Sequence, residues 1–133
     1  MRIDRDEASH LERRTARTMR PSILILEPRP EVAAALEDVV NSANYVAVVA
    51  PHLERISDLE VPPAAIIVRI SFEGTSEPPH AALERLNNRP PVVAIAWEEE
   101  EVAEATRLGC EVVLKAPRDV SKLCEALGRI VGT

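Results

Sequence analysis

Short runs of apolar residues alternate along this chain with longer segments in which apolar residues recur every three or four positions. The runs consist mainly of Val, Ile, Leu and Ala without alternating polar residues, which is typical of strands covered on both faces. They predict five strands, at residues 22–26, 45–49, 64–70, 92–96 and 112–115. The periodic segments predict five helices, at residues 30–42, 52–59, 80–86, 98–108 and 119–131.

Strands and helices that alternate in this way predict a parallel sheet between two layers of helices. Each strand–helix–strand unit is expected to cross over in the right-handed sense. The predicted fold class is therefore α/β: a flavodoxin-like, doubly wound sheet of five parallel strands in the order 2-1-3-4-5, with helices on both faces. Ligands of such sheets bind outside the carboxyl ends of the strands, so candidate functional residues are expected there.

The first 20 residues differ from the rest of the chain. They hold six arginines and four acidic residues and lack a repeating apolar face. Residues 9–12 fit a helical capping box, but Leu11 alone cannot anchor a helix, and we expect residues 1–20 to form a flexible extension. Met19, directly before the first strand, is an alternative start of the chain. Residues 21–133 suit one domain with a single hydrophobic core.

Composition narrows the classes of function. Aromatic residues make up 2% of the chain, which argues against the stacking platforms of single-stranded nucleic-acid binders. The formal net charge of -6 opposes binding to duplex phosphates. No apolar stretch resembles a signal peptide or reaches the roughly 20 residues needed to span a bilayer. We expect a cytoplasmic protein without nucleic-acid or membrane partners.

Motifs for catalysis and cofactor binding are not found in the sequence. The four glycines form no phosphate-binding loop, and the three histidines are not spaced for a catalytic triad or a zinc site. Cys110 and Cys124 lack metal-ligand spacing and are expected to be small buried residues near the fifth strand and the last helix. We therefore predict a protein that is not an enzyme and has no metal or other cofactor.

The segment from Gly109 to Pro117 is the most informative part of the chain. It consists of a turn, a buried strand and an X-Pro bond at the end of that strand. Together with the order and lengths of the other elements, it resembles the last strand of response-regulator receiver domains, and the resemblance extends over residues 21–131. The family places its phosphoryl chemistry at the carboxyl ends of the strands.

The resemblance implies five functional positions, and four of them carry residues unsuited to receiver chemistry. Glu27 and Pro28 stand where the family has two acidic residues that help to bind magnesium. Arg69 stands in place of the phosphorylated aspartate, Ala96 in place of a serine or threonine, and Ala116 in place of a lysine. A proline supplies no ligand side chain, and a guanidinium is no nucleophile. We predict a receiver fold with a degenerate phosphoryl pocket.

Three residues leave alternatives open. Lys115 would replace the missing lysine if the last strand slipped by one residue, although strand alternation directs it to the opposite side. Glu73 is the only nearby carboxylate for an alternative phosphoacceptor. For Arg69 three arrangements are open: exposure to solvent, an ion pair with Glu27 across adjacent strands, or binding of a small anion.

The predicted function is that of a non-catalytic, non-phosphorylatable signalling module that acts by protein–protein interaction. The expected contact surface comprises the fourth helix, the fifth strand and the fifth helix, and the partner is another protein or a second copy. An acidic helix from Glu98 beside a partly basic one with Arg118, Lys122 and Arg129 suits such a contact. The alternative is a sensor of a small anion or ligand in the strand-end cleft around Arg69. A concave cavity there would favour the sensor, and a filled, flat edge would favour the interaction module.

Overall fold

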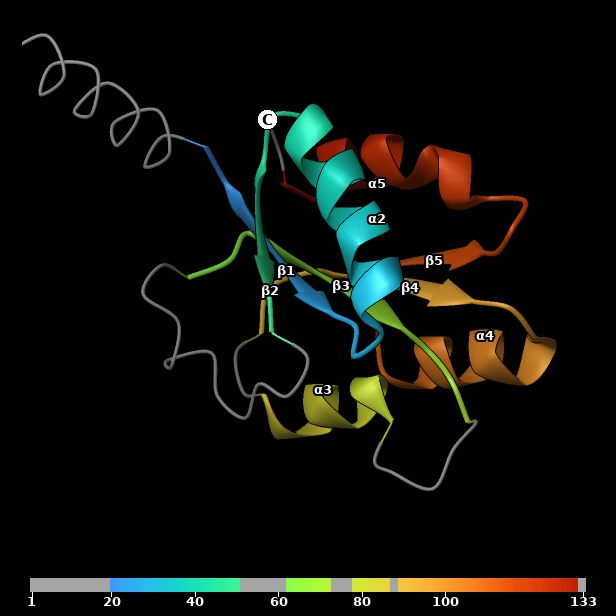
Figure 1. Cartoon of the computed structure of the whole chain (residues 1–133). Coiled ribbons are helices and arrows are strands. Elements are labelled where there is room, and N and C mark those ends of the chain that lie inside the picture. The colour runs from blue at the N-terminus through green and yellow to red at the C-terminus, as the bar shows by residue number, and fades with distance from the viewer. Residues whose placement is uncertain (1–19, 51–61, 73–77, 87–88, 132–133) are drawn as a thin grey trace, which may run out of the picture.

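The computed structural model describes residues 20–50, 62–72, 78–86 and 89–131. Its centre is a sheet of five parallel strands in the order β2-β1-β3-β4-β5, as predicted (Figure 1). The strands are β1 (Ser22–Leu26), β2 (Val46–Val49), β3 (Ala65–Arg69), β4 (Val92–Ala96) and β5 (Val112–Lys115). Because they are parallel, their carboxyl ends meet at the same edge of the sheet.

Helices cover both faces of this sheet (Figure 1). On one face lie α2 (Pro30–Ser42) and α5 (Leu123–Val131), and on the other α3 (Ala82–Arg85) and α4 (Glu99–Arg107). The predicted helix at 80–86 is a 3-10 turn (η2, Pro79–Ala81) followed by the short α3, and α5 is likewise preceded by a 3-10 turn (η3, Val120–Lys122). The helix expected at 52–59 lies outside the described residues.

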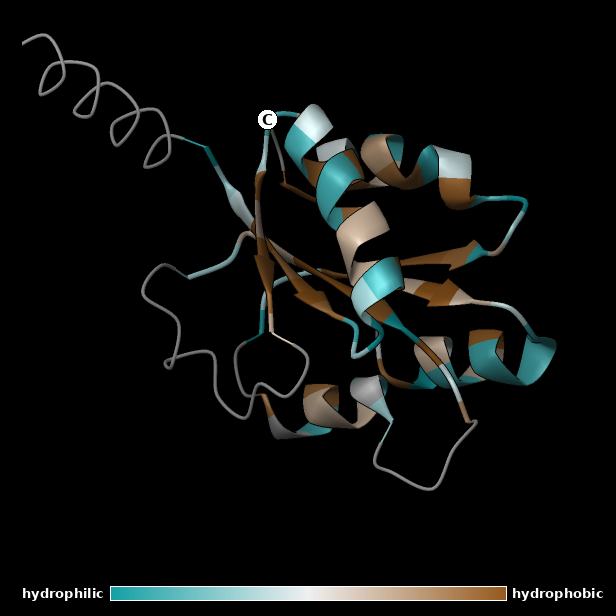
Figure 2. Ribbon diagram, in the orientation of Figure 1, coloured by the Kyte–Doolittle hydropathy of each residue, from teal (hydrophilic) through white to brown (hydrophobic). Residues whose placement is uncertain are grey.

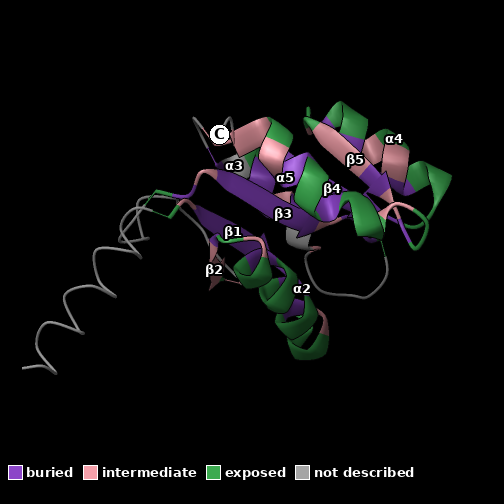
Figure 3. Cartoon of the chain, turned by 90° about the horizontal axis from the view of Figure 1, so that it is seen from above, coloured by how far each residue is buried: buried purple, intermediate pink, exposed green. Residues whose placement is uncertain are grey.

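The core consists of two apolar layers separated by the sheet. Along β1, Ile23 and Ile25 pack on the face of α2 and α5, whereas Leu24 and Leu26 pack on the other face, and all four are fully buried. The central strands β1, β3 and β4 are hydrophobic and almost entirely buried, whereas the edge strands β2 and β5 are mostly half-buried (Figures 2 and 3). Each such side chain contributes roughly 1.5–3 kcal/mol by leaving water, so the uninterrupted apolar runs account for the layered architecture.

Two residues, one after α4 and one at the start of α5, can be compared with the sequence predictions. Gly109, which the sequence places in a turn before the last strand, follows α4 with a positive φ of 78°, a conformation that glycine adopts without strain. Cys124 is exposed, so its predicted burial is wrong, because Leu123, Ala126 and Leu127 form the inward face of α5 and Cys124 lies outside it. No helix within the described ranges is long and apolar enough to cross a bilayer.

Candidate functional site

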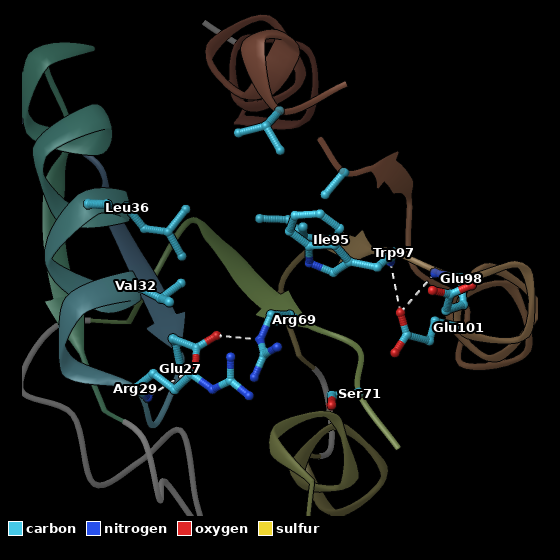
Figure 4. A pocket seen from close by; sticks show the side chains of 13 residues that line it. Glu27, Arg29, Val32, Leu36, Arg69, Ser71, Ile95, Trp97, Glu98 and Glu101 are labelled. Carbon is cyan, nitrogen blue, oxygen red and sulfur yellow. Dashed lines mark hydrogen bonds and ion pairs between the residues drawn. The ribbon is translucent and has the colours of Figure 1, made fainter. Parts of the chain in front are cut away.

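A cavity of about 490 Å³ opens at the carboxyl ends of the strands (Figure 4). Its walls come from the ends of β1, β3, β4 and β5, from one side of α2, and from the first turn of α4. The charged lining residues are Glu27, Arg29, Arg69, Glu98 and Glu101. The main apolar lining residues are Val32, Leu36, Ile95, Trp97, Ala116 and Val120.

The carboxylate of Glu27 is held at the end of β1 by two donors. Its Oε1 accepts a hydrogen bond of 3.0 Å from the backbone N–H of Arg29, and its Oε2 accepts one of 2.9 Å from Nε of Arg69. Pro28 has no N–H, so Arg29 is the first backbone donor after Glu27. Arg29 is also the N-cap of α2, where a negative charge complements the helix dipole. Local sequence and helix position together therefore fix this carboxylate.

The ion pair between Glu27 and Arg69 is one of the three arrangements that the sequence left open for Arg69. It joins neighbouring strands, and the side chains are 1% and 14% exposed for Glu27 and Arg69 respectively. Arg69 bonds through Nε, and its two terminal nitrogens have no hydrogen-bond partner among the described residues. Among the described residues, every buried side-chain nitrogen or oxygen has a hydrogen-bond partner. The unpartnered terminal nitrogens of Arg69 are therefore not buried and are accessible from the cavity that Arg69 lines.

This geometry does not fit the magnesium ion that receiver chemistry would require. Both oxygens of Glu27 are already engaged by cationic or backbone donors. Pro28 offers no side-chain ligand, and the guanidinium of Arg69 brings a positive charge to the carboxylate in place of a metal. Magnesium needs near-octahedral oxygen coordination with at least one available carboxylate. The described residues at this edge therefore do not fit a magnesium ion.

The last two predicted site residues, Ala96 and Ala116, carry only methyl side chains. Ala116 is 5% exposed and lines the cavity, whereas Ala96 is fully buried and is not part of the lining. Lys115 does not line the cavity, because its ammonium group pairs with Glu99. The register pairs Ala96 with Lys115, so the last strand has not slipped to bring the lysine inside. Glu73, the alternative acceptor, lies outside the described residues.

Sequence reasoning missed the role of Glu101. Its side chain accepts hydrogen bonds from the backbone N–H groups of Trp97 (2.8 Å) and Glu98 (3.0 Å), and it is buried. The side chain of Glu98 accepts in return from the backbone N–H of Glu101, which completes a capping box. The four consecutive glutamates that begin at Glu98 thus supply capping hydrogen bonds as well as negative charge at the start of α4. The glutamate three positions after Glu98 was the available signal.

A buried histidine lies beyond the end of β3, next to the cavity residue Ser71. Nδ1 of His80 accepts a hydrogen bond of 3.4 Å from the backbone N–H of Ser71, and the ring of Phe72 meets the imidazole edge-on. Burial lowers the pKa of His80, and the nearby carboxylates of Glu104 and Glu84 oppose this effect. The neutral imidazole therefore anchors the segment that follows Arg69.

Known proteins resemble this chain in structure. No family model and no curated protein matches this chain. Solved structures match most of its length. A sensor protein from Polaromonas sp. JS666 has a TM-score of 0.68 at 20% identity, covering 84% of this chain and 96% of that one. A response regulator receiver protein from Burkholderia phymatum has a TM-score of 0.66 at 14% identity, covering 85% and 96%.

This chain has the receiver fold. NtrX from Brucella abortus, in a complex with ATP, also matches with a TM-score of 0.68 and 16% identity over 85% of this chain. The chain spans 27% of the length of NtrX. At these identities the likeness establishes the fold, and the residues at the strand ends must carry any statement about function.

Proposed function

We propose that this chain is a receiver-like signalling module that does not accept a phosphoryl group and acts through contact with another protein or with a second copy of itself. The proposal rests mainly on one observation. Where the resemblance places the phosphoacceptor at the end of β3, Arg69 stands and binds Glu27 at 2.9 Å. A guanidinium has no nucleophilic oxygen, and it occupies the carboxylate that a metal would use.

Phosphorylation is the direct test of this proposal. We expect the intact mass of the full chain to stay unchanged after incubation with acetyl phosphate and magnesium, because no carboxylate stands at the end of β3. A receiver domain of known phosphoacceptance in the same tube serves as the control for the reagent. A stoichiometric adduct that is stable in acid and labile in base would contradict the proposal.

The contact surface that we propose comprises α4, β5 and α5. Some charges on or beside it are satisfied within the chain: Lys115 of β5 pairs with Glu99 of α4, and Arg118, in the turn after β5, pairs with Asp119 at 3.1 Å. Exposed Glu100 lies in the first turn of α4 and exposed Arg129 in the last turn of α5, so the surface carries both signs of charge. Such a surface suits a charge-complementary partner or an isologous contact between two copies.

Reversing two of these charges tests the surface. The double variant Glu100→Arg/Arg129→Glu keeps the net charge and alters only exposed positions. We expect it to lose at least tenfold in self-association by sedimentation velocity, or in capture of a specific protein from the native cell. Glu37→Lys on the exposed side of α2 is the control and should leave association unchanged. Equal association of all three proteins would exclude this surface.

A second candidate function is the sensing of a small ligand in the strand-end cavity. The edge beside Arg69 is concave, with about 490 Å³ of space, and the filled, flat edge expected of a pure interaction module is not found there in the described residues. This volume lies within the usual range for ligand sites. The two candidates are compatible, because a ligand could replace phosphorylation as the input to the same module.

The sensor candidate is testable without knowing the ligand. A panel of small molecules is screened by thermal shift against the wild-type chain and against Ala35→Trp. Ala35 lines the cavity from the exposed side of α2, so an indole there should fill the space without disturbing the core. A stabilising compound that acts on the wild type and not on Ala35→Trp supports the sensor. A panel with no such compound speaks against it.

A further inference from the structure

The strand-end cavity has two chemically different ends (Figure 4). One end carries the side chains of Arg69, at the end of β3, and of Arg29, which follows β1. The other end is apolar and is lined by residues that include Leu36, Ile95 and Trp97. A ligand that matches both ends must carry an anionic group and an apolar body.

The cationic end is built to bind an anion and is only partly neutralised. Glu27 engages Arg69 through Nε at 2.9 Å, which orients the guanidinium and leaves its terminal N–H groups at the cavity. The side chain of Arg29 is exposed and has no partner among the described residues, since only its backbone N–H binds Glu27. Guanidinium groups bind carboxylates through two parallel hydrogen bonds, so an organic carboxylate fits this end.

The remaining charges limit how negative the ligand can be. Glu98 and Glu101 also line the cavity, from the first turn of α4, and both carboxylates accept backbone hydrogen bonds in the capping box. Two arginines thus face three glutamates across the same space. A ligand with several negative charges, such as a nucleotide, would be repelled strongly at the α4 side, whereas a singly charged group bound to Arg69 would be repelled much less.

The apolar end provides room for more than a bare anion. A cavity of about 490 Å³ exceeds the volume of a carboxylate several times. Each methylene group buried against Leu36 or Ile95 strengthens binding by about fourfold. We infer that the cavity binds singly charged organic carboxylates with an apolar body, with the head group on Arg69 and the body between α2 and the end of β4. This inference rests on the sensor candidate above and adds the class of ligand.

Trp97 makes a direct binding assay available. It is the single tryptophan of the chain, lines the cavity and is half exposed, so a ligand that covers it changes its emission. The probes are octanoate, its neutral amide octanamide, acetate and inorganic phosphate, titrated into the full chain. We expect octanoate to bind saturably at one site with a Kd on the order of 0.1–1 mM. Octanamide, acetate and phosphate should each bind at least about tenfold more weakly.

Two pairs of variants locate the site. Ala35→Trp should fill the cavity and weaken octanoate binding at least about tenfold, whereas Ala34→Trp, also exposed on α2 but outside the cavity lining, should not change it. Because these variants add a tryptophan, their titrations are followed by calorimetry. The double variant Glu27→Gln/Arg69→Met removes the head-group site without leaving one charge unpaired. Its affinity for octanoate should approach the affinity of the wild type for octanamide.

The outcomes separate the ligand class from the sensor function. Equal affinity for octanoate and octanamide, tighter binding of phosphate than of octanoate, or undiminished binding to Ala35→Trp would each overturn the inference. Absence of octanoate binding, together with another compound that stabilises the wild type and not Ala35→Trp, would overturn the carboxylate class and leave the sensor function standing. Absence of any cavity-dependent binder would remove both.

Discussion

The ion pair between Glu27 and Arg69 is expected to be the most consequential polar contact at the sheet edge. Its members are 1% and 14% exposed, and both oxygens of Glu27 are bonded. Charge-assisted hydrogen bonds of this kind contribute roughly 1.5–3 kcal/mol. Removal of one partner also leaves a desolvated charge, which costs about 3–5 kcal/mol when burial is complete. Arg69 retains access to the cavity, so the loss of stability should be smaller when Glu27 is removed and Arg69 is the charge left unpaired.

These magnitudes define the expected double-mutant cycle. Glu27→Gln should lower the free energy of unfolding by about 2 kcal/mol, because the cation of Arg69 keeps some solvent contact. Arg69→Met should cost about 3 kcal/mol, because it leaves the carboxylate of Glu27 buried with one backbone donor. The double variant should recover about 1.5–2 kcal/mol of the summed losses, and that recovery is the coupling energy.

Urea unfolding followed by circular dichroism measures all four proteins of the cycle. The control cycle uses Glu99→Gln and Lys115→Met, whose side chains are 80% and 34% exposed and pair only with each other among the described residues. Exposed pairs contribute about 0–1 kcal/mol, so the control coupling should fall in that range. A Glu27–Arg69 coupling no larger than the control would refute the claim that burial at the cavity strengthens this contact.

Three further predictions concern other parts of the molecule. Burial lowers the pKa of His80 below its ordinary 6.5, so on acidification the unfolded state takes up a proton before the folded state does. The stability that depends on a neutral His80 should therefore be fully present above about pH 6.5 and should be lost below it, by up to about 1.4 kcal/mol per pH unit. Urea unfolding from pH 7 to about pH 5 should show this decline in the wild type and a smaller one in His80→Asn. Glu101→Ala removes the acceptor for Trp97 and Glu98 and should cost about 1–2 kcal/mol by urea unfolding, against less than about 0.5 kcal/mol for exposed Glu100→Ala. A chain that starts at Met19 should unfold within about 1 kcal/mol of the full chain, since residues 1–18 are polar; a melting temperature lower by more than several degrees would show that they dock on the domain.

Much of the fold was predictable because its causes are local. The apolar runs predicted β1, β4 and β5 with their observed bounds, and Pro30 marked the start of α2. The strand order followed from right-handed crossovers between successive parallel strands. Short elements were less well predicted: the segment around His80 divides into a 3-10 turn and a four-residue helix, because four or five residues carry too little periodicity to distinguish the two.

The candidate site depended on tertiary structure for most of its properties. The sequence placed Glu27 and Arg69 at strand ends, but only their exposures of 1% and 14% show that the pair is sheltered. The same limit explains Cys124, whose exposure depends on how α5 rotates against the sheet. Side-chain burial is a property of neighbours distant in sequence, and no periodic pattern reports it for single residues.

The cavity shows most clearly which properties of the site depend on the sequence alone and which depend on the tertiary structure. The sequence by itself determined which side chains stand at the carboxyl edge, because a parallel sheet brings all its strand ends together. It did not determine that about 490 Å³ between α2, the end of β4 and the first turn of α4 stays open. Open volume is the small difference between the spacing of packed elements and the size of the side chains between them. That difference is set by the three-dimensional packing of the whole domain, and only the tertiary structure decided it.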